Sequence, residues 1–336
     1  MSALRVLYIG GTGTISTACV TESIQQGHDV TILNRGQSVH RDPHPDARLV
    51  TGDIRAPASA RSALGDATFD VVCSFVSFST EHVLTDVELF RGRVGQYVFI
   101  SSASAYQTPP THMPVTESTP LRNPYWQYSR DKIACEDLLL KTYRDEAFPM
   151  TIVRPSHTYD QMSIVFDGGW TLVDRMRRGV EVVVPGDGTS LWTLTHTEDF
   201  APGFVGLLGR DAAIGEAFHI TSDEALTWNA IFTEMGHAAG VEPKLVHVAT
   251  DAIDVADPKL GAGLVGDKSN TMIFDNTKLR SLVPTFTCPT PFSKGAREIV
   301  DWYDADESRK TVDDKVNSLQ DRLIEAYRPG KVQPVG

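Results

Sequence analysis

Tyr128 and Lys132 stand four residues apart and are the first candidates for chemistry in this sequence. The surrounding residues have the pattern of a helix, and an i, i+4 spacing places both side chains on one helix face. The ammonium can then approach the phenol oxygen and lower its pKa from near ~10 toward working pH, which suits a general acid–base catalyst. The same spacing also occurs on ordinary solvated helices, so other motifs must decide between these interpretations.

A glycine-rich segment near the N-terminus offers a site for phosphate. The segment, residues 10–16 (GGTGTIS), follows an apolar strand pattern at 4–10, leads into a helix pattern at 14–26 and precedes a strand pattern at 29–34. Glycines permit a tight turn and a close approach to a pyrophosphate, which the free N–H groups at the start of the helix would bind. This context predicts dinucleotide binding rather than an ordinary left-handed turn. The predicted contacts are Gly10, Thr12, Gly13, Thr14 and Ile15.

Apolar segments alternate with helix-length segments through the first half of the chain, which predicts an α/β fold with a doubly wound parallel Rossmann sheet. The helix that carries Tyr128 and Lys132 is predicted to begin just after Pro124 and to run to about Leu140. The further strands are predicted at 48–53, 69–75, 96–102, 151–155 and 217–221, the last able to rejoin the main sheet. We expect a dinucleotide-binding domain and a smaller C-terminal α/β substrate-binding domain. Their expected boundaries are 1–160 plus about 190–225, and about 161–189 plus 226–305, respectively.

The segment 306–336 is expected to form an amphipathic helix and a tail. Its apolar residues are three or four apart, which predicts one apolar helix face. We favour packing of this face on its own subunit over an oligomer contact. The residues of the face are Val312, Val316, Leu319, Leu323 and Tyr327.

Composition indicates a globular protein that acts on small molecules. The 336 residues are 41% hydrophobic and carry a net charge of −12, with a pI of about 5.3, which disfavours nucleic acid and anionic membranes as partners. The four cysteines include no CxxC pair and no histidine cluster at metal spacing, so neither a disulfide framework nor a metal site is predicted. No apolar run reaches ~18 residues. We therefore expect a cytoplasmic protein.

Together these motifs resemble the extended short-chain dehydrogenase/reductase superfamily, in its NAD-dependent epimerase/dehydratase branch. The resemblance covers nearly the whole chain. It rests on the glycine loop, Tyr128 and Lys132, and on Asp53, the Ser101-Ser102 strand end with Tyr106, Arg154-Pro155 and the segment 196–199 (HTED). It implies that Tyr128 exchanges the hydroxyl proton, that Lys132 lowers its pKa and binds the nicotinamide ribose, and that Ser102 hydrogen-bonds the reacting oxygen. The further implied cofactor contacts are Asp53, Ile54, Ser74, Phe75, Pro155 and His157, and Ser104 is an implied substrate contact.

The chain departs from the family pattern near the cofactor. Ser16 stands at the third glycine position and is small enough for close helix–strand packing. The second strand ends in Asn34-Arg35 instead of the ribose-binding carboxylate, which removes repulsion against a 2′-phosphate and slightly favours NADP. Arg35 stacked on adenine is the alternative that is compatible with NAD. The segment Ala103-Ser104 replaces the Asp-Glu pair of sugar 4,6-dehydratases and disfavours that reaction.

The substrate end also departs from the family pattern. Trp192 replaces the arginine that clamps the diphosphate of a nucleotide sugar, and the basic residue expected before Gly266-Asp267 is missing. His157 stands where an asparagine is usual. Without arginines a diphosphate is poorly neutralised, which puts nucleotide-sugar recognition in doubt. Trp192 either stacks on a sugar ring or aglycone or forms a half-buried wall, and Lys268 is left to supply one positive charge.

The sequence thus predicts an NAD(P)-dependent oxidoreductase or epimerase that acts on a hydroxyl or carbonyl of a sugar or nucleotide-sugar-like substrate. Bound NAD is expected if the protein is an epimerase, and a homodimer is a candidate assembly. The rival is a non-catalytic NAD(P)-binding regulatory or RNA-associated member of the superfamily. Such relatives tend to lose the tyrosine–lysine pair that this chain keeps, and the acidic balance works against RNA.

Overall fold

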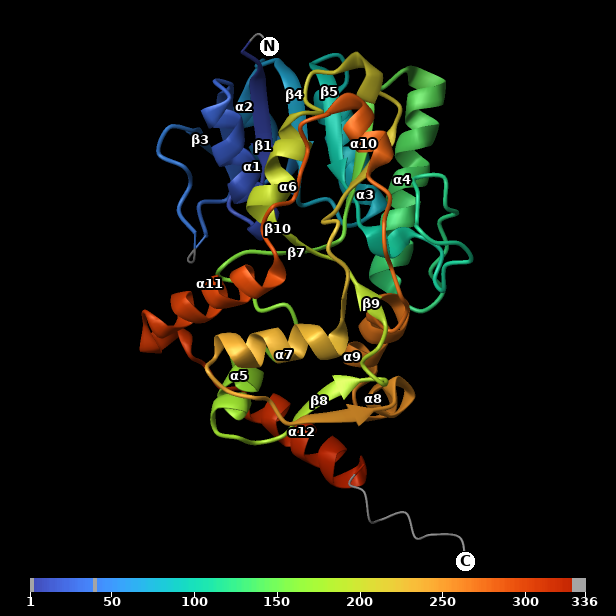
Figure 1. Cartoon of the computed structure of the whole chain (residues 1–336). Coiled ribbons are helices and arrows are strands. Elements are labelled where there is room, and N and C mark those ends of the chain that lie inside the picture. The colour runs from blue at the N-terminus through green and yellow to red at the C-terminus, as the bar shows by residue number, and fades with distance from the viewer. Residues whose placement is uncertain (1–2, 39–40, 328–336) are drawn as a thin grey trace, which may run out of the picture.

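A sheet of seven parallel strands forms the centre of the upper lobe in Figure 1. The computed structural model describes residues 3–38 and 41–327. The strands are β1 (Arg5–Ile9), β2 (Asp29–Asn34), β3 (Arg48–Thr51), β4 (Phe69–Ser74), β5 (Val94–Ile100), β6 (Met150–Pro155) and β11 (Ala217–Ile220). Their order is β11-β6-β5-β4-β1-β2-β3, with every neighbouring pair parallel. The predicted doubly wound sheet is confirmed, including the return of the chain to it at 217–221.

Helices cover both faces of this sheet, because successive strand residues point to opposite sides. In β1, Val6 and Tyr8 enter a core shared with α1 (Thr14–Gln25), α6 (Thr197–Val205) and α10 (Thr277–Leu282). Leu7 and Ile9 enter a second core with α2 (Pro57–Leu64), α3 (Thr80–Phe90) and α4 (Gln127–Glu146). Burial on both faces explains why the strands are nearly continuous apolar runs.

The helix that carries Tyr128 is longer than the sequence suggested. α4 continues past the predicted end near Leu140 to Glu146, and Ala147 ends it in a left-handed conformation with φ of 55°. The apolar and polar residues of its last turns gave no stop signal before that point. α4 therefore extends along the height of the upper lobe at one side of the sheet (Figure 1).

The lower lobe is smaller and mixes helices with short strands. Its helices are α5 (Trp170–Arg177), α7 (Trp228–Ala238), α8 (Thr250–Ala256), α9 (Pro258–Gly263), α11 (Phe292–Asp304) and α12 (Asp314–Tyr327). Its strand pairs are β8 (Val182–Pro185) with β13 (Leu245–Val248), and β9 (Leu191–Trp192) with β12 (Leu226–Thr227). The paired strands β7 (His157–Tyr159) and β10 (Leu194–His196) lie between the lobes (Figure 1). Short 3₁₀ turns occur at Ala103–Ala105, Asp211–Ala213 and Glu307–Arg309, and a π-helical turn at Leu264–Lys268.

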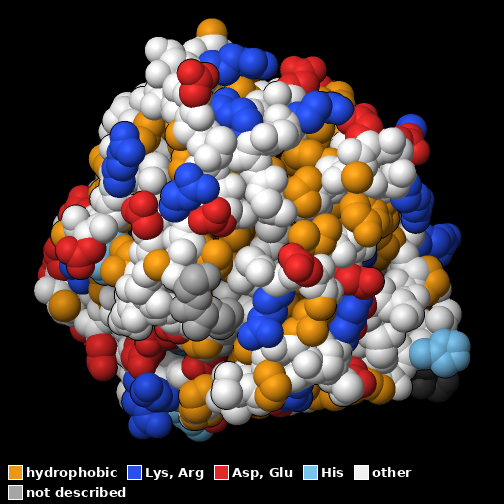
Figure 2. Space-filling view, turned by 90° about the horizontal axis from the view of Figure 1, so that it is seen from above, with side chains coloured by type: hydrophobic (Ala, Val, Ile, Leu, Met, Phe, Trp, Pro, Cys, Tyr) orange, Lys and Arg blue, Asp and Glu red, His pale blue; other side chains and the backbone are white. Residues whose placement is uncertain are grey.

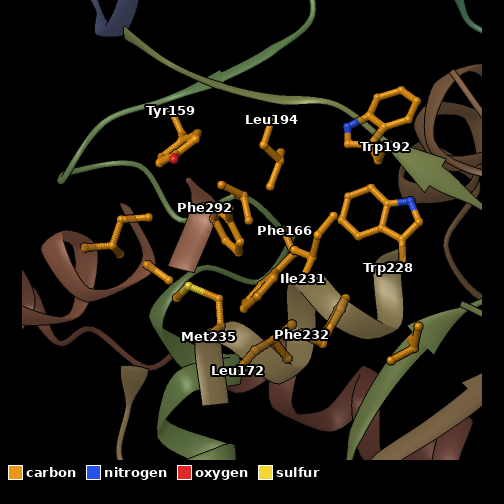
Figure 3. Close-up of a cluster of buried hydrophobic side chains, with 14 of the residues drawn as sticks. Tyr159, Phe166, Leu172, Trp192, Leu194, Trp228, Ile231, Phe232, Met235 and Phe292 are labelled. Carbon is orange, nitrogen blue, oxygen red and sulfur yellow. The ribbon is translucent and has the colours of Figure 1, made fainter. Parts of the chain in front are cut away.

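An aromatic-rich core holds the lower lobe together (Figure 3). Trp192 of β9 stacks on Trp228 of α7 with ring centroids 6.0 Å apart, and Phe166 stacks on Phe232 at 4.6 Å. The core reaches up to Tyr159 of β7, so it also fixes the strands that join the lobes.

The C-terminal helix packs on its own chain, as favoured from the sequence. Leu319 and Leu323 of α12 are buried in a small core with Val183 of β8 and Val248 of β13. The helix begins at Asp314, so Val312 precedes it and does not belong to the predicted face. The predicted tail at 328–336 lies outside the described residues.

Candidate active site

A buried ion pair fixes the orientation of α4. Glu136 lies two helical turns after Tyr128, on the same face as Lys132, and is fully buried. Arg154 of β6 donates to both of its carboxylate oxygens, with Nη2 2.6 Å from Oε2, and the Ser101 hydroxyl donates to Oε1 at 2.5 Å. The face that carries Tyr128 and Lys132 is therefore held toward the carboxyl ends of β5 and β6.

Lys132 is held by backbone carbonyls rather than by the phenol oxygen. Its Nζ donates to the carbonyl of Ile100 at 2.7 Å and to that of Ser77 at 2.8 Å, and lies 5.8 Å from the centroid of the Tyr128 ring. Burial lowers the pKa of Lys132 to about 8. An ammonium has three N–H donors, so one remains after these two bonds.

The pKa of Tyr128 is shifted in the direction opposite to the one expected from the sequence. Burial raises the pKa of Tyr128 to about 12; a hydrogen bond with Ser102 works against this rise, and the charge of Asp267 adds to it. Spacing places Tyr128 and Lys132 on one face, but desolvation of the phenol outweighs any distant cation. Tyr128 is therefore a protonated acid in this state.

Ser102 and Ser104 extend the polar group next to Tyr128. Their hydroxyl oxygens lie 2.9 Å apart, and the Ser129 hydroxyl donates to Ser104 at 2.8 Å. Ser104 is buried, and its backbone carbonyl accepts a bond from the buried Asn123. Ser104 therefore orients Ser102 in this state.

A cavity of about 280 Å³ opens beside these groups. Several predicted residues that are distant in sequence line it together, namely Ser102, Ser104, Tyr128, Pro155, His157, Trp192 and Lys268. Burial, with a smaller effect of Lys268, lowers the pKa of His157 to about 3, so the imidazole is neutral. The site thus joins hydroxyls, a neutral imidazole and one lysine.

Trp192 lines the cavity but is almost fully buried rather than half-buried, and its stacking on a sugar ring stays a prediction. Only 4% of it is exposed, because Trp228 covers its ring. Its Nε1 has no hydrogen-bond partner among the described residues. The sequence could not show this packing, because Trp228 comes from a separate helix.

Asp267 was missed as a candidate, although it lines the same cavity. It lies in the π-helical turn, whose Gly266 carbonyl accepts a bond from Asn123 at 2.5 Å. A Cβ at Gly266 would come 2.6 Å from Cβ of Trp126, so glycine lets this turn approach the start of α4. Burial raises the pKa of Asp267 to about 6. The sequence signals were its place beside Lys268 and its membership of the Gly266-Asp267 pair in the family pattern.

A second cavity, of about 490 Å³, lies at the carboxyl ends of β1, β2 and β3. It brings together the predicted residues Gly10, Thr12, Gly13, Asn34, Arg35, Asp53 and Ile54. Arg35 is exposed, and the Asn34 side-chain oxygen accepts the Gly36 N–H at 2.9 Å. Arg55 also lines this cavity and was missed; its closeness to Asp53 in sequence was the available signal.

The glycine loop fits a dinucleotide pyrophosphate. Gly10 has φ of +91°, and a Cβ there would come 2.5 Å from Val76. Ser16, at the third glycine position, accepts the Gly13 N–H and donates to the Gly10 carbonyl, each at 2.8 Å. The serine thus fixes the tight turn that leaves room for a close approach to phosphate.

The side chains of four predicted cofactor contacts lie outside the second cavity, and contacts through their backbone stay a prediction. The Ser74 hydroxyl is fully buried and donates to Asp86 at 2.8 Å, and the Phe75 ring stacks on Tyr8 in the sheet core. Ile15 packs against the same core. The Thr14 side chain faces a third cavity, of about 780 Å³, next to α6. The side chains at the end of β4 therefore serve the core rather than the second cavity.

Known proteins resemble the chain over most of its length. The model of the NAD dependent epimerase/dehydratase family matches residues 6–221, and the chain belongs to this family. It is 27% identical over 242 residues to the 2'-dehydrokanamycin reductase of Streptomyces kanamyceticus, covering 70% of this chain and 67% of the relative. It is 25% identical over 271 residues to the chloroplast stem-loop binding protein of 41 kDa b of Arabidopsis thaliana, with 77% and 69% covered.

Solved structures share the fold at low sequence identity. Epimerase Mth375 of Methanothermobacter thermautotrophicus has a TM-score of 0.75 at 16% identity, with 91% of this chain and 94% of that chain covered. Within residues 3–38 and 41–327, no helix is both long and apolar enough to cross a membrane.

Proposed function

We propose that this protein is an NAD(P)-dependent oxidoreductase or epimerase that acts on a hydroxyl or carbonyl group of a sugar-like substrate. The observation that carries the proposal is the meeting of Tyr128, Ser102 and Lys132 at the carboxyl end of the sheet, the edge where open α/β sheets bind ligands. The relatives include a reductase whose name gives a sugar derivative as its substrate, and sugar epimerases.

In this proposal each of the three side chains has one task. Ser102 hydrogen-bonds the reacting oxygen, and the protonated Tyr128 donates its proton as negative charge develops there. The remaining N–H of Lys132 binds the nicotinamide ribose. The glycine loop holds the pyrophosphate, and the bound nicotinamide supplies or accepts the hydride.

The cofactor preference proposed is for NADP. Arg35 and Arg55 both line the second cavity, where the adenosine end of a dinucleotide would lie. The Asn34 amide has no charge to repel a 2′-phosphate. The exposed Arg35 is the guanidinium that favours the nucleotide with the extra phosphate, because Arg55 already donates to the Val76 carbonyl and lies 3.9 Å from Asp86.

A test of the function compares Tyr128→Phe with Tyr125→Phe. Tyr125 is exposed three residues earlier and serves as a matched control. We expect Tyr128→Phe to abolish NADPH consumption over a panel of keto sugars while NADPH affinity, measured by fluorescence titration, stays within about twofold. Lys132→Ala should lower both NADPH consumption and NADPH affinity. Undiminished single-turnover rates in Tyr128→Phe would remove this site from the mechanism.

The relative named for stem-loop binding raises the alternative of an RNA-associated protein. Figure 2 looks down on the upper lobe and shows acidic and basic side chains interspersed on that face. The net charge of −12 also opposes binding to a phosphate backbone. Catalysis is the better-supported function, because the chain keeps the acid and its serine partner at one cavity, with Lys132 buried on the same helix.

A further inference from the structure

We propose that the cavity beside Tyr128 binds an unphosphorylated sugar ring whose hydrogen-bond donors are taken by Asp267, and that it does not take the diphosphate of a nucleotide sugar. The proposal rests on the function proposed above, since it names the substrate class of the same site. The proposal is about the charge and the hydrogen-bond donors of the ligand. A binding experiment can test both without measuring activity.

The charge of the cavity disfavours a diphosphate. None of the described residues that line it is an arginine, and its one lysine, Lys268, already lies between two carboxylates. Its Nζ is 4.0 Å from Asp267 and 3.9 Å from Asp167. The imidazole of His157 is neutral. A diphosphate would therefore meet a single shared cation and a carboxylate of like charge.

The Asp267 carboxylate lacks a hydrogen-bond donor among the described residues. Its carboxyl group lines the cavity with 15% of the side chain exposed, and no hydrogen bond from any described residue reaches it. An ionised carboxylate only accepts, so the ligand must bring donors to it. Sugar hydroxyls and an ammonium are donors, whereas a phosphate group offers mainly further acceptor oxygens. A donor-bearing ring completes this site, and a phosphate does not.

The size of the cavity and its aromatic lining suit one sugar ring. Its volume of about 280 Å³ lies below the roughly 300–1,000 Å³ of sites that enclose drug-sized ligands, which suits one ring. Trp126 and Phe274 contribute apolar surface, and Trp126 lies against Tyr128 with ring centroids 4.8 Å apart. A sugar presents apolar C–H faces and a polar edge, so an aromatic wall with a carboxylate at one side matches its shape.

The placement of Asp267 is rigid enough to select a ligand. The buried Asn123 amide bonds both the Gly266 carbonyl and the Ser104 carbonyl, so it ties the turn before Asp267 to the serines at Tyr128. A ring that reaches Tyr128 therefore meets Asp267 at a fixed position.

The test measures binding to the NADP-loaded protein by the indole N–H signals of ¹⁵N-labelled tryptophan, with the Trp126 signal assigned by Trp126→Phe. The probes are methyl α-D-glucopyranoside, glucosamine, glucose 6-phosphate and UDP-glucose. We expect the first two to shift the Trp126 signal and the two phosphates to bind at least about tenfold more weakly. Tighter binding of glucosamine than of the glucoside would identify an ammonium as the donor to Asp267. Tighter binding of the glucoside would identify hydroxyl groups as the donors. Either result supports the proposal.

Two variants separate Asp267 from general charge effects. Asp267→Asn should weaken the best monosaccharide about tenfold, as expected for loss of a charged hydrogen-bond acceptor. Asp167→Asn is the matched control, because this carboxylate also faces Lys268 but does not line the cavity, and it should leave binding unchanged. Tighter binding of UDP-glucose than of either monosaccharide, no shift with any probe, or equal losses in the two variants would overturn the proposal. Loss of turnover in Tyr128→Phe is unaffected by these outcomes, so the two proposals fail separately.

Discussion

Replacing Glu136 by glutamine should destabilise the upper lobe severely, although the two side chains have nearly the same shape. Glu136 is fully buried and its partner Arg154 keeps only 5% of its side chain exposed. Glutamine offers one acceptor oxygen and turns an NH₂ toward the guanidinium, so a buried positive charge loses its counter-charge. Removal of one member of a buried pair costs about 3–5 kcal/mol, and the retained oxygen places our expectation near 3 kcal/mol.

Asp145→Asn provides the control on the same helix. Asp145 pairs with Lys141 four residues earlier, and both side chains are more than half exposed. Exposed i, i+4 pairs contribute about 0.3–0.5 kcal/mol, so this variant should be nearly silent.

The assay is urea unfolding at neutral pH, with hydrogen exchange of the α4 amides as a second measurement in case the lobes unfold separately. If Glu136→Gln costs no more than Asp145→Asn at an unchanged m value, the ion pair is not what anchors α4. The orientation of Tyr128 and Lys132 would then need another cause.

Three further predictions concern the loop, the cofactor and the substrate cavity. Gly10→Ala should lower the free energy of unfolding by about 1–2 kcal/mol and weaken NADPH binding in a fluorescence titration, because φ is +91° and the new Cβ would meet Val76. Arg35→Ala should weaken NADP by about 1.5–3 kcal/mol and leave NAD nearly unchanged, and Asn34→Asp should reverse the preference; equal losses for both nucleotides would instead mean stacking on adenine. Burial raises the pKa of Asp267 from its ordinary 3.8 to about 6, so wild type should lose about 2–3 kcal/mol of stability as pH rises from about 4 to above 6. Asp267→Asn lacks that loss and should be the more stable protein at pH 7.5 but not at pH 4, as urea unfolding at both pH values would reveal.

The sheet and the glycine loop could be predicted because their signals are local. A strand buried on both faces must be an apolar run, as in β1 and β4, and a turn at φ of +91° needs a glycine such as Gly10. The spacing of Tyr128 and Lys132 likewise follows from helix geometry alone.

The electrostatics and the far side of the cavity could not be predicted, because they depend on partners distant in sequence. The atoms that hold the Lys132 ammonium are carbonyls of Ser77 and Ile100, and backbone carbonyls leave no trace in residue type. The π-helical turn and the hydrogen bond from the Asn123 side chain to the Gly266 carbonyl place Asp267 at the cavity. Neither feature produces a periodic pattern in the sequence. Contacts between residues distant in sequence therefore determine the pKa shifts in the site and the position of Asp267.

Burial acts in opposite directions on the two side chains that define the site. It raises the pKa of Tyr128 to about 12 and lowers that of Lys132 to about 8, because in each case it disfavours the charged form. At neutral pH the chain therefore presents a neutral phenol as proton donor and a lysine that is still charged. Proton donation to a developing alkoxide needs this pair of states, whereas oxidation of an alcohol needs the phenolate. In the proposed function this arrangement suits the reductive direction, and the oxidative half of an epimerase cycle would need a lower phenol pKa.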